Sequence, residues 1–119
     1  MASTTPEQLR NRTKEFALRI VRMFRALPRS PEAQIIGKQL LRAGMSVGAN
    51  YRAVCRSRSK AEFIAKLGIV VEEADESAFW LELLIETNTF KKEKLEGLLQ
   101  EARELTALFN ASRTTTKRT

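Results

Sequence analysis

Apolar residues recur at spacings of three and four along most of the chain, a pattern typical of amphipathic helices. The first pattern begins at Thr5-Pro6-Glu7-Gln8, which has an N-cap residue, a first-turn proline and a capping-box glutamine. Because Pro28 should end the helix near Leu27, we predict a helix over residues 6–27. Its apolar face holds Leu9, Phe16, Ala17, Ile20, Met23, Phe24 and Leu27, and its polar face holds Arg12, Arg19, Arg22, Arg25 and Arg29.

A second helix is predicted over residues 31–57, starting at Ser30-Pro31-Glu32 by the same reasoning. Its apolar stripe is Ile36, Leu40, Ala43, Val47, Tyr51 and Val54, with Lys38, Arg42, Arg52 and Arg56 roughly opposite. Glycines inside a helix each cost about 1 kcal/mol relative to alanine. Gly44 and Gly48 are four residues apart, so they would form one flat patch where another backbone packs closely. A kink in the helix is the alternative.

The third predicted helix, over residues 60–87, starts with the capping box Ser59-Lys60-Ala61-Glu62. Its core face is Phe63, Leu67, Val70, Ala74, Ala78, Leu81 and Ile85, whereas Phe79, Trp80 and Leu83 point away from that face. A helix that is apolar nearly all round needs burial on more than one side. We therefore predict that Phe79, Trp80 and Leu83 contact other subunits of an oligomer. Partly exposed aromatics covered by lysine stems are the alternative.

Asn88-Thr89 is a polar break before a fourth predicted helix over residues 90–111. Its apolar stripe is Leu95, Leu98, Leu99, Ala102, Leu105 and Phe109. Residues 112–119 contain no apolar side chain, so they should form a flexible basic tail. Four amphipathic helices with short connections predict an all-α, single-domain, antiparallel up-down-up-down four-helix bundle over residues 1–111.

The composition excludes several kinds of chemistry. The chain has no histidine and one cysteine, Cys55, so it lacks the usual ligands of a zinc site and cannot supply a His-based catalytic triad. We expect no enzyme activity, no metal and no cofactor, and we expect Cys55 to be a buried small apolar residue. The carboxylates at residues 72–76 should form a solvated or inter-subunit face rather than a metal site. No apolar run suits a signal peptide or a membrane span, so we expect a cytoplasmic protein without membrane contact.

Charge is unevenly distributed along the chain. The net charge is +7, and residues 1–60 hold 13 Lys and Arg against 3 Asp and Glu. Such a basic half predicts either an anionic partner or complementary contacts between subunits. Arginine binds phosphate with paired donors, so nucleic acid is the leading partner, contacted through its backbone with low sequence specificity. The candidate binding residues are Arg12, Arg19, Arg22, Arg25, Arg29, Lys38, Arg42, Arg52, Arg56, Arg113, Lys117 and Arg118.

Three short motifs between Gln39 and Leu84 resemble a bacterial four-helix-bundle family named for proteins encoded in intervening sequences of 23S rRNA genes. The motifs are R-A-x-x-S-V-x-A-N from Arg42, S-x-x-E-F from Ser59, and E-x-x-F-W-L-E-L from Glu76. The resemblance implies a four-helix fold that commonly assembles as a ring-like homopentamer. Accessory variability proteins of diversity-generating retroelements are similar, and they are basic pentamers that partner a reverse transcriptase and its RNA.

Two functions of different classes therefore remain open. One is a non-enzymatic, oligomeric accessory protein that binds RNA or DNA, with a reverse transcriptase as a further partner. The other is a structural or protein-binding oligomer whose basic stripes pair with acidic helices of neighbouring subunits.

Overall fold

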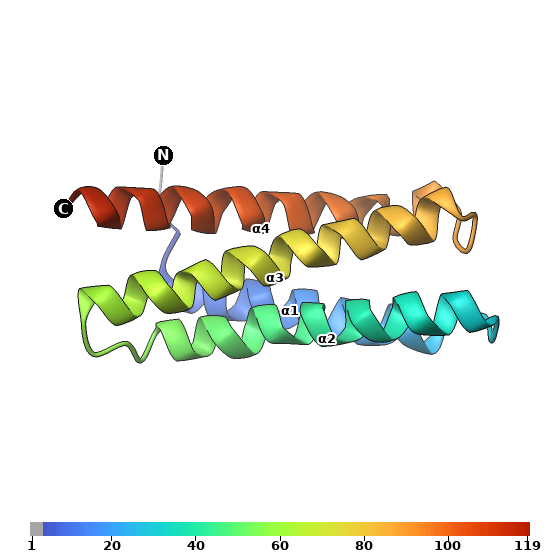
Figure 1. Cartoon of the computed structure of the whole chain (residues 1–119), viewed down its shortest axis with the longest axis horizontal. Coiled ribbons are helices and arrows are strands. Elements are labelled where there is room, and N and C mark those ends of the chain that lie inside the picture. The colour runs from blue at the N-terminus through green and yellow to red at the C-terminus, as the bar shows by residue number, and fades with distance from the viewer. Residues whose placement is uncertain (1–3) are drawn as a thin grey trace.

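The computed structural model describes residues 4–119 as four helices, and consecutive helices run in opposite directions (Figure 1). The helices are α1 (Pro6–Arg25), α2 (Pro31–Val54), α3 (Lys60–Glu86) and α4 (Lys92–Arg118). Residues 4–119 contain no strand, which confirms the all-α class. No helix in this part of the chain has the length and apolarity that a membrane span requires. Residues 1–3, which we assigned to the same domain, lie outside the described residues.

Side-chain caps start two of the helices. The Thr5 hydroxyl accepts from the Gln8 amide at 3.1 Å, and the Gln8 side chain accepts from the Thr5 amide at 2.8 Å. Both halves of this predicted capping box are therefore present. At α3 the Ser59 hydroxyl accepts from the Glu62 amide at 3.0 Å, but the Glu62 carboxylate pairs with Lys66 instead of the cap. The second predicted box is thus half formed.

The helix ends differ from the predicted ones by a few residues. α1 ends at Arg25 and not at Leu27, because the last two amides before Pro28 bond three residues back and tighten the turn. α2 ends at Val54, three residues before the predicted end. Between α3 and α4, Asn88 adopts a left-handed backbone with φ of 58°, a conformation that Asn tolerates better than most residues. The predicted polar break is therefore a tight reversal of the chain.

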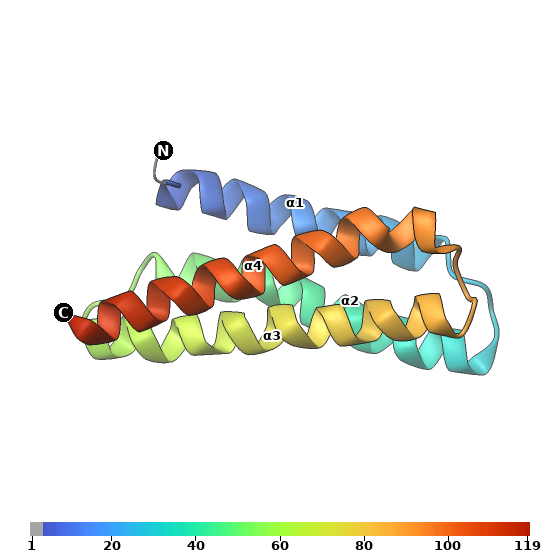
Figure 2. The ribbon, with the colours of Figure 1, turned by 90° about the horizontal axis from the view of Figure 1, so that it is seen from above.

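The predicted flexible tail is helical and continues α4 to Arg118. The Arg113 side chain explains part of this difference, because it lies against Gly68 of α3 and its Nε donates to the Ile64 carbonyl at 3.2 Å. The Thr116 hydroxyl donates to the Ser112 carbonyl at 2.9 Å, one turn back. Seen from above, α4 runs obliquely from the end of α1 to the start of α3 (Figure 2). The basic segment is thus attached to α3.

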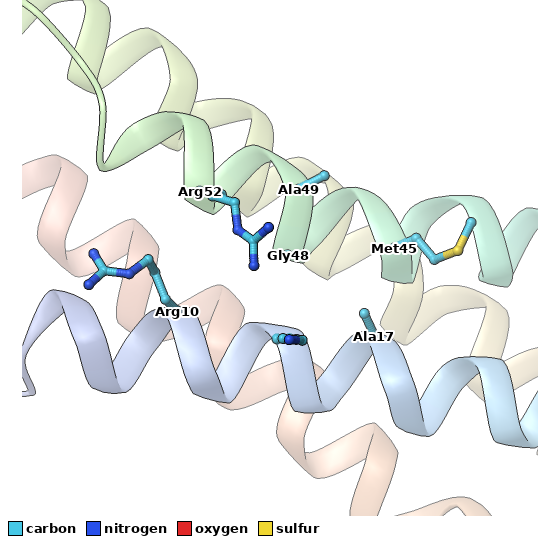
Figure 3. Close-up of a pocket in the computed structure, with 7 residues that line it drawn as sticks. Arg10, Ala17, Met45, Gly48, Ala49 and Arg52 are labelled. Carbon is cyan, nitrogen blue, oxygen red and sulfur yellow. The ribbon is translucent and has the colours of Figure 1, made fainter.

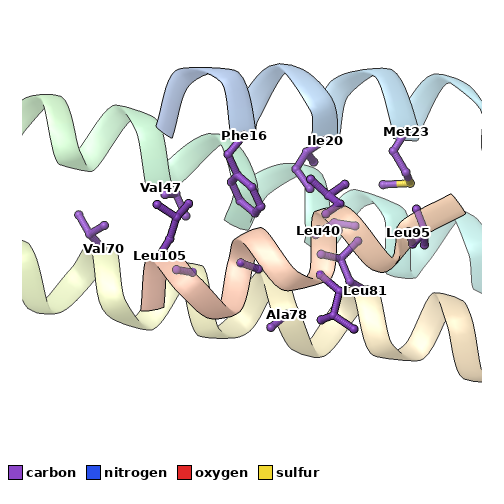
Figure 4. Close-up of a cluster of buried hydrophobic side chains, with 14 of the residues drawn as sticks. Phe16, Ile20, Met23, Leu40, Val47, Val70, Ala78, Leu81, Leu95 and Leu105 are labelled. Carbon is purple, nitrogen blue, oxygen red and sulfur yellow. The ribbon is translucent and has the colours of Figure 1, made fainter. Parts of the chain in front are cut away.

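Every helix contributes most of its predicted apolar stripe to one continuous core, part of which is shown in Figure 4. Ala17 is an exception, because it is only partly buried and lies outside that core. The fully buried large side chains include Phe16, Ile20, Leu40, Val47, Leu67, Val70, Leu81, Leu84, Leu105 and Phe109. α3 differs from its prediction, because Leu84 is buried whereas Ile85 is only partly so. Ser77 is also buried, and its hydroxyl donates to the Glu73 carbonyl at 2.8 Å, which satisfies the polar atom.

The glycines of α2 face α1 and allow a close approach of the two helices. A Cβ added to Gly44 would lie 2.7 Å from Cγ1 of Ile20. A Cβ added to Gly48 would lie 3.3 Å from the Thr13 carbonyl oxygen, so the backbone of α1 itself covers this position. The predicted flat patch at Gly44 and Gly48 is therefore the packing surface for α1.

We predict opposite effects of alanine at two helical glycines. Gly44→Ala should lower the free energy of unfolding by roughly 1 kcal/mol, because overpacking against Ile20 outweighs the gain in helix propensity. Gly97 on α4 is exposed, and its added Cβ would meet only Arg19 at 3.4 Å. Gly97→Ala should therefore raise the free energy of unfolding by up to about 1 kcal/mol. Urea unfolding followed by circular dichroism measures both, and equal shifts of the same sign would contradict the packing argument.

Candidate nucleic-acid interface

A groove between α1 and α2 gathers basic side chains from both helices. Because the two helices are antiparallel, the start of α1 lies beside the end of α2, which brings Arg10 and Lys14 opposite Arg52 and Arg56. All four side chains are exposed. Figure 3 shows Arg10 on α1 and Arg52 on α2 at the same groove. The structure thus forms one compact cationic site from residues about 40 positions apart in sequence.

The floor of the groove next to these cations is made of small and apolar residues. Ala17 comes from α1, and Met45, Gly48 and Ala49 come from α2 (Figure 3). Gly48 is the position at which the backbones approach, so no side chain rises between the helices there. Met45 is 44% exposed although it is a large apolar residue. The groove is therefore cationic at one end and apolar farther along.

The four cations have no acidic neighbours at salt-bridge distance. Within residues 4–119, neither Arg10, Lys14, Arg52 nor Arg56 forms a salt bridge. Positive charges at one concave surface repel one another and raise the local potential for anions. This arrangement suits a phosphate backbone, since arginine presents several N–H donors in a plane.

Two of the predicted binding arginines instead connect helices within the bundle. Arg12 of α1 donates to both carboxylate oxygens of Glu101 on α4, at 2.7 Å each, and to Glu104 at 3.0 Å. The hydrogen bond with Glu101 is the main cause of a raised pKa for Arg12.

Arg42 of α2 donates to one oxygen of each of two carboxylates on α3, Glu73 at 2.9 Å and Glu76. The sequence did not predict these intramolecular partners. They correct the assignment of Glu73 and Glu76 to a solvated or inter-subunit face, and they hold Arg12 and Arg42 in structural contacts.

Three more residues of the predicted set lie away from the groove. Arg22 pairs with Glu15 on its own helix at 3.2 Å, and Arg113 is bound to α3. Arg19 and Arg22 line a separate pocket between α1 and α4, together with Lys94 and Phe90. This pocket has an apolar floor, and one of its two α1 cations already has an acidic partner.

The remaining predicted residues are exposed and scattered. They are Arg25 and Arg29 at the connection between α1 and α2, Lys38 on α2, and Lys117 and Arg118 at the end of α4. Of the predicted set, the structure therefore places only Arg52 and Arg56 at the cationic end of the groove, where it adds Arg10 and Lys14. Lys38 and Arg42 line a depression farther along α2. The four-residue spacing of Arg10 and Lys14 on α1 was visible in the sequence, but the helix that they face was not.

Cys55 lies at the edge of the groove and is exposed, so the prediction of a buried cysteine is wrong. It follows the last residue of α2, where the chain turns away from the core toward α3. Its neighbour Tyr51 is buried and packs against Phe109, with ring centroids 5.0 Å apart. Burial raises the pKa of Tyr51, and the neighbouring Cys55 thiol adds to that shift.

The residues predicted for subunit contacts differ in exposure. Phe79 is 51% exposed, whereas Trp80 and Leu83 are partly buried against the core. The Trp80 indole Nε1 donates to Glu76 at 3.0 Å. The Trp80 ring packs edge-on against the Phe79 ring, with ring centroids 4.9 Å apart. Phe79 is thus the member of this set with the largest exposed fraction.

Comparisons with known proteins agree with the fold. A family model described as 23S rRNA-intervening sequence protein matches residues 7–111. The chain is also similar to a crystal structure of a protein with unknown function from the S23 ribosomal protein family of Bacteroides thetaiotaomicron VPI-5482. The two chains are 36% identical, the match covers 88% of this chain and 97% of that one, and the TM-score is 0.82. No curated protein matches the chain.

The two classes of arginine should differ in their effect on stability. We predict that Arg42→Gln lowers the free energy of unfolding by about 1 kcal/mol, because it removes a bridge to two carboxylates across the α2–α3 contact. Arg52→Gln should leave the free energy of unfolding nearly unchanged, because the relief of repulsion in the groove offsets the loss of a cation that is favourable in the last turn of α2. Urea unfolding at low and high salt measures both effects. Equal destabilisation by the two variants would contradict the division into structural and unpaired cations.

Proposed function

The chain belongs to the 23S rRNA-intervening sequence protein family, and we propose that it is a non-enzymatic accessory protein that binds nucleic acid in the α1/α2 groove. The observation that supports this proposal is the cluster of Arg10, Lys14, Arg52 and Arg56 without acidic partners in the described residues. A folded protein that holds such charges together at a cost in repulsion gains most from an anionic ligand.

The ligand is recognised through its phosphates. The groove offers several cationic donors on an open surface and no deep pocket that would enclose a base edge. Contacts of this kind fix the position of a nucleic acid but carry little sequence information. RNA and DNA share the backbone charge, so both are proposed ligands, with RNA favoured by the resemblance to retroelement accessory proteins. A reverse transcriptase is the further protein partner that this resemblance implies.

The proposed role is binding without catalysis. The chain has no histidine, and the only thiol near the groove is Cys55, which therefore has no imidazole base to activate it. Burial raises the pKa of its neighbour Tyr51, so the phenol stays protonated at neutral pH and does not replace that base.

We also propose that the protein acts as a homopentamer. The resemblance supports this assembly, and a ring would present five copies of the groove, so that weak contacts add through multivalency. The competing role, an oligomer held together by basic stripes against acidic helices, has fewer groups to use. Glu73, Glu76, Glu101 and Glu104 are already paired with arginines of the same chain.

We predict that reversing charge in the groove abolishes binding. Arg10→Glu combined with Arg52→Glu should weaken the binding of a fluorescently labelled RNA or DNA at least tenfold at low salt, because it replaces attraction to phosphate by repulsion. Lys91→Glu combined with Lys92→Glu is the matched control, since it changes the net charge equally at the start of α4, at the far end of the bundle (Figure 1). Fluorescence anisotropy gives both affinities, and circular dichroism checks that helicity is retained.

A salt series provides a second readout. If four phosphates are neutralised, the logarithm of affinity should fall with that of salt at a slope of roughly −3 to −4. Cys55 provides a third readout, because bound nucleic acid should protect the exposed thiol from maleimide labelling. Equal binding by the groove variant and its control, or no binding of RNA or DNA by the unaltered protein, would refute the proposed function.

Assembly is tested at the exposed aromatic side chain of α3. Phe79→Asp should lower the mass of the oligomer, because it places a charge on the most exposed of the predicted contact residues. Leu99→Ala is the control in the core, and it should lower the free energy of unfolding by about 2–5 kcal/mol while the mass stays the same. Sedimentation equilibrium measures the mass, and a folded wild-type monomer at micromolar concentration would refute the pentamer.

A further inference from the structure

The α1/α2 groove continues beyond its cations along the surface of α2. The cationic end and the apolar middle share Arg10, Lys14 and Arg52 among their lining residues. The apolar middle in turn shares Met45 and Ala49 with a shallow depression on α2 that reaches Leu41. Lys38 and Arg42 also line this depression, and Arg42 is already paired with Glu73 and Glu76. The apolar middle of the groove, around Met45 and Ala49, is open to solvent and lies between the four unpaired cations and these two residues.

The apolar part of the groove is suited to stacking against an aromatic ring. Ala17, Gly48 and Ala49 are small, so beyond Lys14 the groove is lined by residues with no side chain larger than a methyl group, apart from Met45 (Figure 3). Met45 rises beside them with 44% of its surface exposed. A methionine thioether is polarisable and makes favourable contacts with aromatic rings. An aromatic group placed here would cover apolar surface that is otherwise in water.

We propose that the groove is a site for single-stranded nucleic acid, with phosphates on Arg10, Lys14, Arg52 and Arg56 and an unpaired base against Met45. This inference rests on the proposed function and specifies the form of its ligand. A nucleotide has a phosphate and an aromatic base. The phosphate matches the cationic end of the groove, and the base matches the adjacent apolar part.

Duplex nucleic acid matches only the cationic end. Its base faces are stacked inside the helix, so it presents phosphates and sugars to a shallow protein surface. It would use the four cations and leave Met45 and the alanines in water. A single strand exposes base faces that stack on suitable side chains without regard to sequence. A second copy of the chain is the competing occupant, and the test below separates it from a strand.

The test compares a labelled oligothymidylate with its duplex of equal length, at one low salt concentration, by fluorescence anisotropy. Met45→Ala should weaken binding of the oligothymidylate by about two- to tenfold, in line with a lost sulfur–aromatic contact, and leave duplex binding unchanged. Met45→Phe should strengthen binding of the single strand, because an aromatic platform stacks better on a base. Leu18→Ala on α1 is the control. Leu18 is an exposed large apolar residue like Met45, but it does not line the groove.

The outcomes distinguish this inference from the proposed function. Duplex and single strand bound equally well, with both insensitive to Met45, would overturn this inference and leave the proposed function standing. Failure of the unaltered protein to bind any nucleic acid would remove both. If Met45→Ala lowered the oligomer mass and left binding of the oligothymidylate unchanged, the apolar part would belong to a subunit contact, and the inference would again be overturned.

Discussion

The structure depends on the close approach of α1 to the glycine face of α2. Gly44 and Gly48 carry no side chain, so Ile20 packs within 2.7 Å of the position of a Cβ at Gly44, and the Thr13 carbonyl oxygen lies 3.3 Å from that of a Cβ at Gly48. Each glycine costs helix propensity, and the loss is offset only where another helix packs against it. This contact sets the distance between the helices and therefore places the arginines at the start of α1 beside those at the end of α2. A wider separation would divide the groove into two unrelated basic surfaces.

A second constraint divides the basic residues into two classes. Arg12 and Arg42 each bridge two carboxylates on a neighbouring helix, which connects α1 to α4 and α2 to α3. The bidentate pair of Arg12 with Glu101 fixes geometry as well as adding energy, and Arg42 makes one contact to each of two carboxylates. The positive charge of the first half of the chain is therefore not uniformly available. The cations that remain for a ligand in the groove are Arg10, Lys14, Arg52 and Arg56, which form no salt bridge within residues 4–119.

The periodicity of the sequence predicted the four helices, the glycine contact and most of the core, because these features depend on the faces of one helix at a time. It did not predict the partners of Arg12 and Arg42, or the place of Arg10 and Lys14 in the groove. These features depend on how one helix is rotated against the next. The helical end of α4 was missed for a related reason, since Arg113 is held by a backbone carbonyl of α3 that no local pattern reveals.

The groove exists only in the folded protein, because its cations come from two helices, and this couples binding to stability. Charges that repel one another across α1 and α2 lower the stability of the free protein, and an anion that binds only the native state reverses that effect. The bundle can carry this repulsion because Arg12 and Arg42 are compensated and the core is continuous across all four helices. The same fold therefore gives its arginines two different environments. Arg12 and Arg42 pair with carboxylates of neighbouring helices, whereas Arg10, Arg52 and Arg56 leave the groove with positive charge that no carboxylate of the described residues compensates.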